Sequence, residues 1–381
     1  MVNLLEDLSL RKVLGVNYLL VCDWLILFFY VDDIILLFTK ANRQKVESLI
    51  ERLQQRLELR QIKDANWFLG IRIVRDRSRR LLWLCQDSYI EKVANRFNIA
   101  DKTNVLAHTP VVIEPLEPYQ GTATAAERLG YQSRVGSINF AAVISRPDVA
   151  KASSTLSRFL QNPGPEHLKA ADRVIAYLAR TKFLAIQYGG FSQSEATICG
   201  DPLVTCSLES YSDAAFADHS DRKSSNGFLF LLGGGPIDWK ASKQSTVTTS
   251  TTEAELLGLS STAKELVAWQ RFFKHLPYPV KNTQLIYTDN RQTQRLLKEE
   301  EPLLTTKLRH VDIHQHWLRE KVQQGDINVE WTNTISMKAD GLTKPLSRQP
   351  FQRFVRQLNL VNIEHIIVQN AVKERRPGGV C

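Results

Sequence analysis

Hydrophobic positions change their spacing along the chain, and this change divides the chain into two parts. In the first part, β-type apolar runs at 25–31 and 34–38 flank Asp32 and Asp33. This pattern predicts a hairpin with both aspartates at its tip. The surrounding stretch 13–38 is strongly apolar, but three acidic residues interrupt it, and a membrane span would rarely carry them. We therefore expect two buried strands in this stretch.

Further apolar spacing in the first part predicts a second hairpin and five helices. The hairpin strands are 68–74 and 81–84, joined by the highly basic turn 75–80. Apolar residues at helical spacing, or a proline near the first turn, predict helices at 41–60, 86–97, 131–144, 147–160 and 165–181. A proline-rich stretch that begins at Thr109 predicts a linker before the last three helices.

From residue 209 the pattern alternates between short β-type runs and helical stretches. The predicted strands are 210–214, 228–232, 237–239, 247–249, 285–288 and 328–331. The predicted helices are 252–275, 291–298, 312–323 and 338–346. Several short strands, a long helix and then strand–helix alternation are typical of a mixed α/β sheet. The polar stretch 191–208 is expected to join the two parts, and the basic stretch from 347 is expected to be a loosely held tail.

Composition narrows the class of protein only a little. The chain has 381 residues and an apolar fraction of 43%, which suit two or three soluble domains. A net charge of +9 is compatible with a polyanionic partner, or with a merely basic surface. Five scattered cysteines and no signal peptide indicate reduced thiols in an intracellular compartment, either nucleus or cytoplasm. The histidines show no zinc-binding pattern.

Four acidic residues in the second part are the strongest chemical signal. Asp213, Glu255, Asp289 and Asp340 each lie near the end of a predicted element or within a short one. Carboxylates gathered on one face of a sheet can hold a pair of Mg²⁺ ions against a phosphodiester. Each acid alone is better explained as a helix cap, a turn residue or a solvated helix position. The four together, in this order and on these elements, are much harder to explain in that way.

The second part resembles the ribonuclease H domain of copia-type LTR retrotransposon polyproteins over about 209–346. The matching segments are Tyr211 to Asp218, Asp221 to Gly227, Ser250 to Leu256, Ile286 to Asn290, Arg309 to Ile313 and Ala339 to Lys344. The resemblance implies a ribonuclease H fold. It also implies Mg²⁺-dependent cleavage, with two metal ions, of the RNA strand of an RNA:DNA hybrid.

The family motif can be transferred residue by residue. Asp213 matches the aspartate of the first strand, Asp289 the aspartate that ends the fourth strand, and Asp340 the aspartate of the last helix. In the long helix, the apolar residue that follows favours Glu255 over Glu253. These four residues would be the catalytic and metal-binding groups. Cellular ribonucleases H also carry a histidine before the last aspartate.

No histidine lies between Asn328 and Asp340 in this chain. His310 or His314 could serve a related role, although helix packing or a surface position is the favoured interpretation.

The first part resembles a reverse transcriptase. The segment Tyr30-Val-Asp-Asp33 is similar to the catalytic hairpin, and the resemblance extends through 68–73 and 131–138. In the family, Asp32 and Asp33 help to bind the metals that receive the incoming nucleotide. Such a polymerase also needs a third carboxylate from an upstream strand, and only 29 residues precede Tyr30. Asp23 is a poor substitute because it adjoins the hairpin strand itself. We therefore expect a truncated polymerase that is inactive alone.

The sequence as a whole predicts α/β and α+β folds: a partial reverse-transcriptase palm and connection, then a ribonuclease H-like mixed sheet with flanking helices. The expected units are 1–110 (partial reverse transcriptase), 120–190 (helical thumb or connection), 205–346 (ribonuclease H-like) and 347–381 (basic tail). The leading hypothesis is a nuclease that acts on RNA:DNA hybrids, with no membrane partner. The alternative is a degenerate relic that at most binds nucleic acid.

Overall fold

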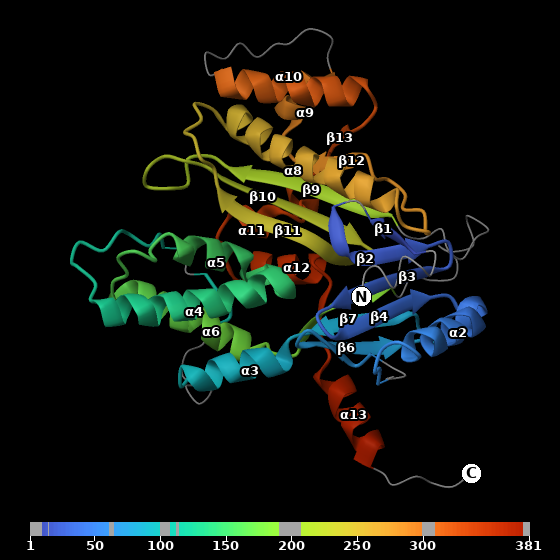
Figure 1. Ribbon diagram of the computed structural model, residues 1–381. Helices are drawn as coiled ribbons and strands as arrows, with labels where there is room; N and C mark the ends of the chain where they lie inside the picture. The colour runs from blue at the N-terminus through green and yellow to red at the C-terminus, as the bar shows by residue number, and fades with distance from the viewer. Residues whose placement is uncertain are drawn as a thin grey trace.

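A computed structural model describes residues 10–13, 15–60, 65–99, 107–111, 114–189, 207–298 and 309–375. Within these residues the strands form one four-stranded sheet and two five-stranded sheets. Figure 1 shows the long helix α8 and helix α10 above the β9–β11 sheet, the helices α3 to α6 on one side, and β1 to β4 with α2 on the other.

The first sheet has the order β1-β2-β3-β4 and is antiparallel throughout. The predicted hairpin is confirmed, because Tyr30 pairs with Asp33 across the turn. The sequence analysis expected two strands in 13–38, but a third strand, β2 (Val16–Cys22), also lies in this stretch. The strands are β1 (Arg11–Val13), β2 (Val16–Cys22), β3 (Leu25–Tyr30) and β4 (Asp33–Phe38), followed by the short turn η1 (Lys40–Asn42) and α2 (Arg43–Gln54).

Both faces of the first sheet are covered by apolar side chains. Val46, Leu49 and Leu53 of α2 pack on one face, where they meet buried leucines of β2 and β3. The opposite face contacts Phe272 and Leu276, at the end of α8. The palm-like sheet therefore rests directly on the second half of the chain.

The second sheet joins segments that are far apart in the sequence, in the order β14-β8-β7-β6-β5. The predicted strand 68–74 is broken, because Leu69 and Gly70 both have positive φ and form a tight turn. The sequence analysis missed β8, which pairs with β7. The strands are β5 (Trp67–Phe68), β6 (Ile71–Asp76), β7 (Leu81–Cys85), β8 (Leu184–Gly189) and β14 (Leu360–Asn362).

The predicted helices of the middle region are confirmed with small changes of length. Helix α4 begins at Ala125, six residues before the predicted start at 131. Its start is capped by Thr124 and Glu127, each of which accepts a hydrogen bond from the backbone nitrogen of the other. The predicted helix 147–160 consists of a 3-10 turn and a shorter α-helix. The elements are α3 (Asp87–Arg96), α4 (Ala125–Ile144), η2 (Pro147–Val149), α5 (Ala150–Ser157) and α6 (Pro165–Arg180).

The third sheet has the order β11-β10-β9-β12-β13, with three antiparallel strands and then two parallel ones. The predicted mixed sheet is confirmed. Its strands are β9 (Leu208–Ala215), β10 (Ser225–Leu232), β11 (Gly235–Lys243), β12 (Leu285–Thr288) and β13 (Asn328–Trp331). The accompanying helices are α8 (Thr251–Phe273), α9 (Arg291–Lys298), α10 (Arg309–Gln323), η3 (Thr334–Ser336) and α11 (Asp340–Thr343).

Two predictions for this sheet were wrong. The segment 247–249 is a loop, because its polar groups pair with side chains instead of a neighbouring strand: Thr248 contacts Ser224, and Thr249 donates to Glu253. The last predicted helix, 338–346, is a single short turn that begins at Asp340. Of the joining stretch 191–208, only residues 207 and 208 fall within the described residues.

The prediction of a loosely held tail is wrong for residues 348–362. Helix α12 (Arg348–Gln357) buries Phe351 and Phe354, and β14 then pairs with β8. Helix α13 (Glu364–Arg375) comes last. The buried phenylalanines belong to a core shared with Leu229 and Leu231 of β10 and with the helices α4 to α6. The helical region and the mixed sheet therefore fold against each other.

Candidate metal-binding active site

Asp213 lies on the central strand of the mixed sheet. Strand β9 pairs with β10 on one side and with β12 on the other, α8 and α11 pack against it, and Asp213 is 1% exposed. Its Oδ2 accepts a hydrogen bond from Thr343 Oγ1. Its Oδ1 is buried and has no hydrogen-bond partner among the described residues. A buried, unpaired carboxylate oxygen is costly, so a cation at this position would remove an unfavourable feature.

Glu255 and Glu253 both lie on the first turns of α8, but they face different surroundings. Glu253 Oε2 accepts from the backbone nitrogen and the hydroxyl of Thr249, 2.7 and 2.6 Å away, and Ser250 Oγ caps the Glu253 nitrogen. Glu253 is thus engaged at the helix start. Glu255 is buried beside Asp213. This arrangement favours Glu255 as the site residue.

Asp289 follows the last residue of β12, at the carboxyl end of a strand parallel to β9. One ligand atom each from Asp213, Glu255 and Asp289 lie within 4.8 Å of one another, close enough to share one metal ion. Thr334 donates to Asp289 Oδ2 at 3.2 Å, and Trp331 donates to its backbone carbonyl. Three elements that extend over more than 70 residues of the sequence therefore bring three carboxylates together.

Asp340 enters the site from α11 and is linked to Asp213 through a lysine. Lys344 Nζ lies 2.6 Å from Asp340 Oδ1 and 3.5 Å from Asp213 Oδ2. The sequence analysis gave no role to Lys344, although its position four residues after Asp340 places the two side chains on the same side of a helical turn. Thr343 was also overlooked.

The site changes the acidity of its own groups. Burial, together with the neighbouring Asp289 and Asp340 carboxylates, raises the pKa of Asp213 to about 6, despite the opposing effects of Lys344 and of the hydrogen bond from Thr343. Burial also raises the pKa of Glu255 well above its ordinary value, with Asp213 and Asp289 adding to the effect. Carboxylates that repel one another in a buried site bind a cation favourably because the cation offsets both the burial and the repulsion.

The aspartates of the hairpin lie apart from this acidic group. Asp32 is in the turn between β3 and β4, Asp33 begins β4, and both are exposed. Asp23 lies in the turn between β2 and β3 and pairs with Arg11 on the surface. Among the described residues, the structure brings no third carboxylate to Asp32 and Asp33 to form a metal-binding group.

Of the two histidines considered, His314 Nδ1 lies 2.8 Å from Ser260 Oγ on α8. The side chain of His310 lies outside the described part of the structure. The candidate role for a histidine therefore remains a prediction.

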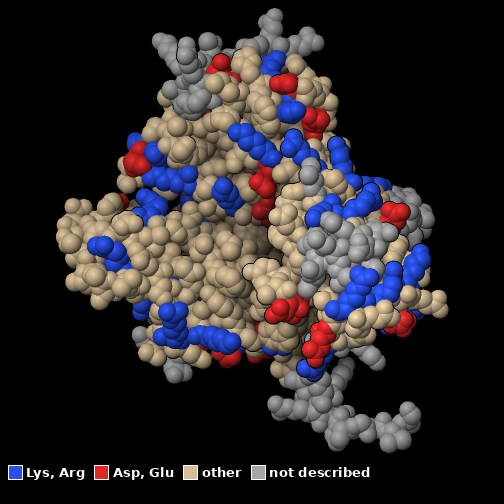
Figure 2. Space-filling model, in the orientation of Figure 1, with Lys and Arg blue, Asp and Glu red and all other residues tan. Residues whose placement is uncertain are grey.

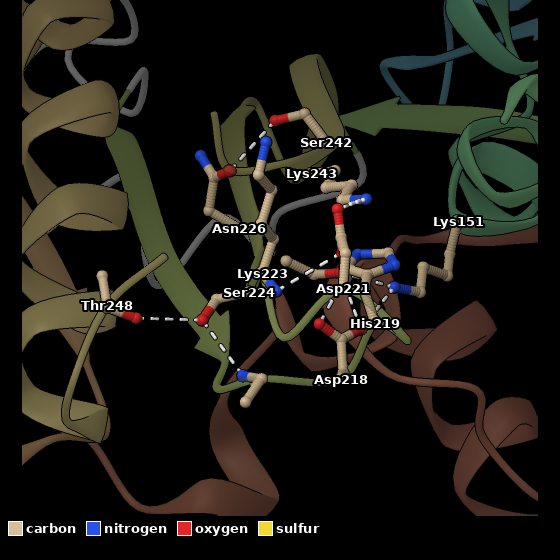
Figure 3. Close-up of polar contacts among 12 residues, drawn as sticks. Lys151, Asp218, His219, Asp221, Lys223, Ser224, Asn226, Ser242, Lys243 and Thr248 are labelled. Atoms are coloured by element: carbon tan, nitrogen blue, oxygen red, sulfur yellow. Dashed lines mark hydrogen bonds and ion pairs between the residues drawn. The ribbon is translucent and has the colours of Figure 1, made fainter. Parts of the chain in front are cut away.

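A buried polar network joins the helical region to the loop that follows Asp213 (Figure 3). Lys151 of α5 donates to Ser225 Oγ at 2.8 Å and lies 3.2 Å from Asp218 Oδ2. Ser225 in turn donates to Asp218, and His219 Nε2 lies 2.9 Å from Ser225 Oγ. Ser225 pairs with Ala215, two residues after Asp213, so the network supports the strand that carries the site.

The surface is basic, but its charge is spread out. Figure 2 shows Lys and Arg side chains in several groups over one face, with fewer Asp and Glu. This agrees with the net charge of +9. Within the residues that the structure describes, no helix is long and apolar enough to cross a membrane.

The strand order and the carboxylates define the class of the second part. Three antiparallel strands followed by two parallel ones, with helices on the sheet and acids on its central strands, form a ribonuclease H-like fold. It follows reverse-transcriptase-like sheets in the same chain. The hard oxygen ligands and the unpaired Asp213 Oδ1 suit a divalent cation such as Mg²⁺.

Comparisons with known proteins place the chain in a family. A family model described as reverse transcriptase (RNA-dependent DNA polymerase) matches residues 10–112. The chain is 34% identical over 87% of its length to the retrovirus-related Pol polyprotein from transposon TNT 1-94 of Nicotiana tabacum. It covers 24% of that relative, and 72% of the putative transposon Ty5-1 protein of Saccharomyces cerevisiae, to which it is 30% identical. The chain belongs to the copia-type retrotransposon Pol family. It spans about a quarter of the length of the plant relatives.

Two solved structures align with the chain at low sequence identity and low TM-score. The ribonuclease H1 from Halobacterium salinarum is 13% identical and aligns over 36% of this chain and 94% of its own, with a TM-score of 0.27. A foamy viral protease–reverse transcriptase in complex with an RNA/DNA hybrid is 12% identical and aligns over 85% of this chain and 58% of its own, with a TM-score of 0.26.

Proposed function

We propose that this chain is an Mg²⁺-dependent endonuclease that cleaves the RNA strand of RNA:DNA hybrids. The observation that carries the proposal is the convergence of Asp213, Glu255 and Asp289 from three separate elements. Asp340, which forms an ion pair with Lys344, would be the fourth acid of the site. The family and the fold support the same conclusion.

The chain's own residues would provide most of the reaction environment. Asp213, Glu255 and Asp289 would hold one Mg²⁺ ion, and Asp213 with Asp340 would hold a second. Bound there, the ions would supply an activated water and stabilise the departing 3′ oxygen. Burial of Asp213 and Glu255 keeps the site in a low-dielectric environment, where electrostatic stabilisation is stronger. Contacts to 2′-hydroxyls would select the RNA strand.

Cleavage of a labelled hybrid tests this function. With Mg²⁺, the full chain should cut the RNA strand of a hybrid and leave the matching RNA duplex intact. Asp213→Asn should lower the cleavage rate by roughly 100-fold or more because it removes the central metal ligand. The control is Asp326→Asn, an acid that pairs with Lys321 at the surface. Equal rates for wild type and Asp213→Asn would support a relic without nuclease activity.

The polymerase part is proposed to be inactive in isolation. Asp32 and Asp33 are exposed at a hairpin tip, and among the described residues no third acid joins them. A primed RNA template with labelled nucleotides tests this point. Mg²⁺-dependent incorporation that is lost in Asp33→Asn would overturn it.

A further inference from the structure

Lys344 is a lysine that forms ion pairs with two acids of the site. Its Nζ lies between Asp340 Oδ1 at 2.6 Å and Asp213 Oδ2 at 3.5 Å. A lysine amine held by two carboxylates carries a positive charge, and here it partly offsets the negative charge of the site.

The two carboxylate oxygens of Asp213 have different surroundings. Oδ2 accepts from Thr343 and faces Lys344, whereas Oδ1 is buried and has no partner among the described residues. One ligand atom each of Asp213, Glu255 and Asp289 already lie within 4.8 Å of one another, whereas the ion pairs of Lys344 are with Asp213 and Asp340. The position between Asp213 and Asp340 already contains an ammonium group.

We propose that Lys344 occupies the second cation position of the metal-free site, so that divalent cations fill the Asp213–Glu255–Asp289 position first. The second position becomes available only when Lys344 leaves Asp340. This inference rests on the proposed metal-binding function and adds an order of filling to it. The geometry permits the exchange because the Lys344 side chain is 38% exposed and has a flexible stem that can turn towards water.

The charge of Lys344 should weaken the binding of the second divalent cation. An ammonium and a divalent cation at the same position repel each other strongly, so binding of the second ion must include the cost of moving Lys344 away from two carboxylates. Replacing Lys344 by a neutral residue removes that cost. The second ion should then bind more tightly, even though the variant has lost a site residue.

Calorimetric titration of the full chain with Mg²⁺, or with Mn²⁺ as a probe, tests the inference without substrate. Wild type should show one tighter and one weaker binding event. Lys344→Gln should strengthen the weaker event on the order of tenfold. Lys344→Arg, which keeps the charge, and Lys338→Gln, a lysine that pairs with Glu209 outside the site, should resemble wild type. An unchanged or weakened second event in Lys344→Gln would overturn the inference.

A second measurement uses the wild-type chain and does not depend on the folding of a variant. Lysine acylation by an amine-reactive ester, followed by mass spectrometry, reports the accessibility of each amine. Lys344 should react faster at saturating Mg²⁺ than in chelator, while Lys338 should not change. Equal reactivity of Lys344 in both conditions would contradict the exchange.

The two proposals fail in different ways. A chain that shows the metal-binding shift but does not cut hybrids would retain this inference and reject the nuclease function. A chain that cuts hybrids, but whose metal binding is unchanged in Lys344→Gln, would retain the nuclease function and reject this inference. Absence of any divalent-cation binding would reject both.

Discussion

Gly227 lies directly opposite Asp213 in the antiparallel pair of β10 and β9. A Cβ atom on Gly227 would lie 2.7 Å from Leu342 Cβ and 3.0 Å from Thr343 Cγ2. Thr343 is the residue that donates to Asp213 Oδ2. The absence of a side chain at Gly227 therefore allows α11 to pack against the sheet and place Thr343 at the site.

Gly227→Ala should displace α11 and weaken both the fold and the site. We expect a loss of about 1–3 kcal/mol in the free energy of unfolding, the usual cost of overpacking, together with slower hybrid cleavage. Urea unfolding and the cleavage assay measure the two effects. The matched control is Gly136→Ala on α4, where a Cβ meets nothing within 4 Å and should be neutral or stabilising. Wild-type stability in Gly227→Ala would show that α11 adjusts easily.

Glu255→Gln and Glu253→Gln should separate the two glutamates of α8. Glu255→Gln should abolish most hybrid cleavage and weaken metal binding, with little loss of stability, because it removes a buried charge beside Asp213. Glu253→Gln should retain cleavage but lower stability by about 1 kcal/mol, because Glu253 accepts two hydrogen bonds from Thr249 at the helix start. The opposite pattern of activity would assign the site to Glu253.

Lys151→Met should loosen the contact between α5 and the mixed sheet. It removes both the hydrogen bond to Ser225 and the ion pair with Asp218, which we expect to cost about 1–3 kcal/mol of stability. A double-mutant cycle with Asp218→Asn should give a coupling energy above about 0.5 kcal/mol. Lys169→Met removes an exposed ion pair with Glu166 and should cost less than about 0.5 kcal/mol. Similar losses in both lysine variants would argue against the network.

His219 should make stability depend on pH. Burial lowers the pKa of His219 to about 4, against an ordinary value of 6.5 in the unfolded chain. Between these values the unfolded chain binds a proton that the folded protein does not bind, so stability should fall as the pH decreases from 6.5 to 4. His219→Gln should reduce this slope, as measured by urea unfolding across the window. Parallel curves of unfolding free energy against pH for wild type and His219→Gln would contradict the prediction.

Phe354→Ala should show that the residues after 347 belong to the core. Phe354 is 2% exposed, and its ring lies against Gly341 next to Asp340. We expect a loss of about 3–5 kcal/mol in stability, typical of truncating a buried phenylalanine. Val368→Ala, at a position on α13 that is 56% exposed, is the control and should have little effect. A small effect of Phe354→Ala would support a loosely held tail.

Local patterns in the sequence were sufficient for much of the fold. The bounds of β12, α9 and β13 agree with the predicted ranges, because short apolar runs and helical spacing act within a few residues. The prediction of a strand at 247–249 was wrong because Thr248 and Thr249 form hydrogen bonds with side chains, and the spacing of residues does not reveal such bonds. The sequence analysis missed β8 and β14, since two short strands that pair across such a distance in the sequence, Leu360 with Ile186, leave little local signal.

The sequence alone determined the family resemblance, the mixed sheet and the candidate acids, with Glu255 favoured over Glu253, because these depend on residue types and their order. Only the tertiary structure decided which groups meet. It separated Glu255 from Glu253 by the direction of their side chains, gathered Asp213 with Asp289, and placed Lys344 between Asp213 and Asp340. Such contacts depend on strand order and packing across the whole chain, and no short segment of sequence contains that information.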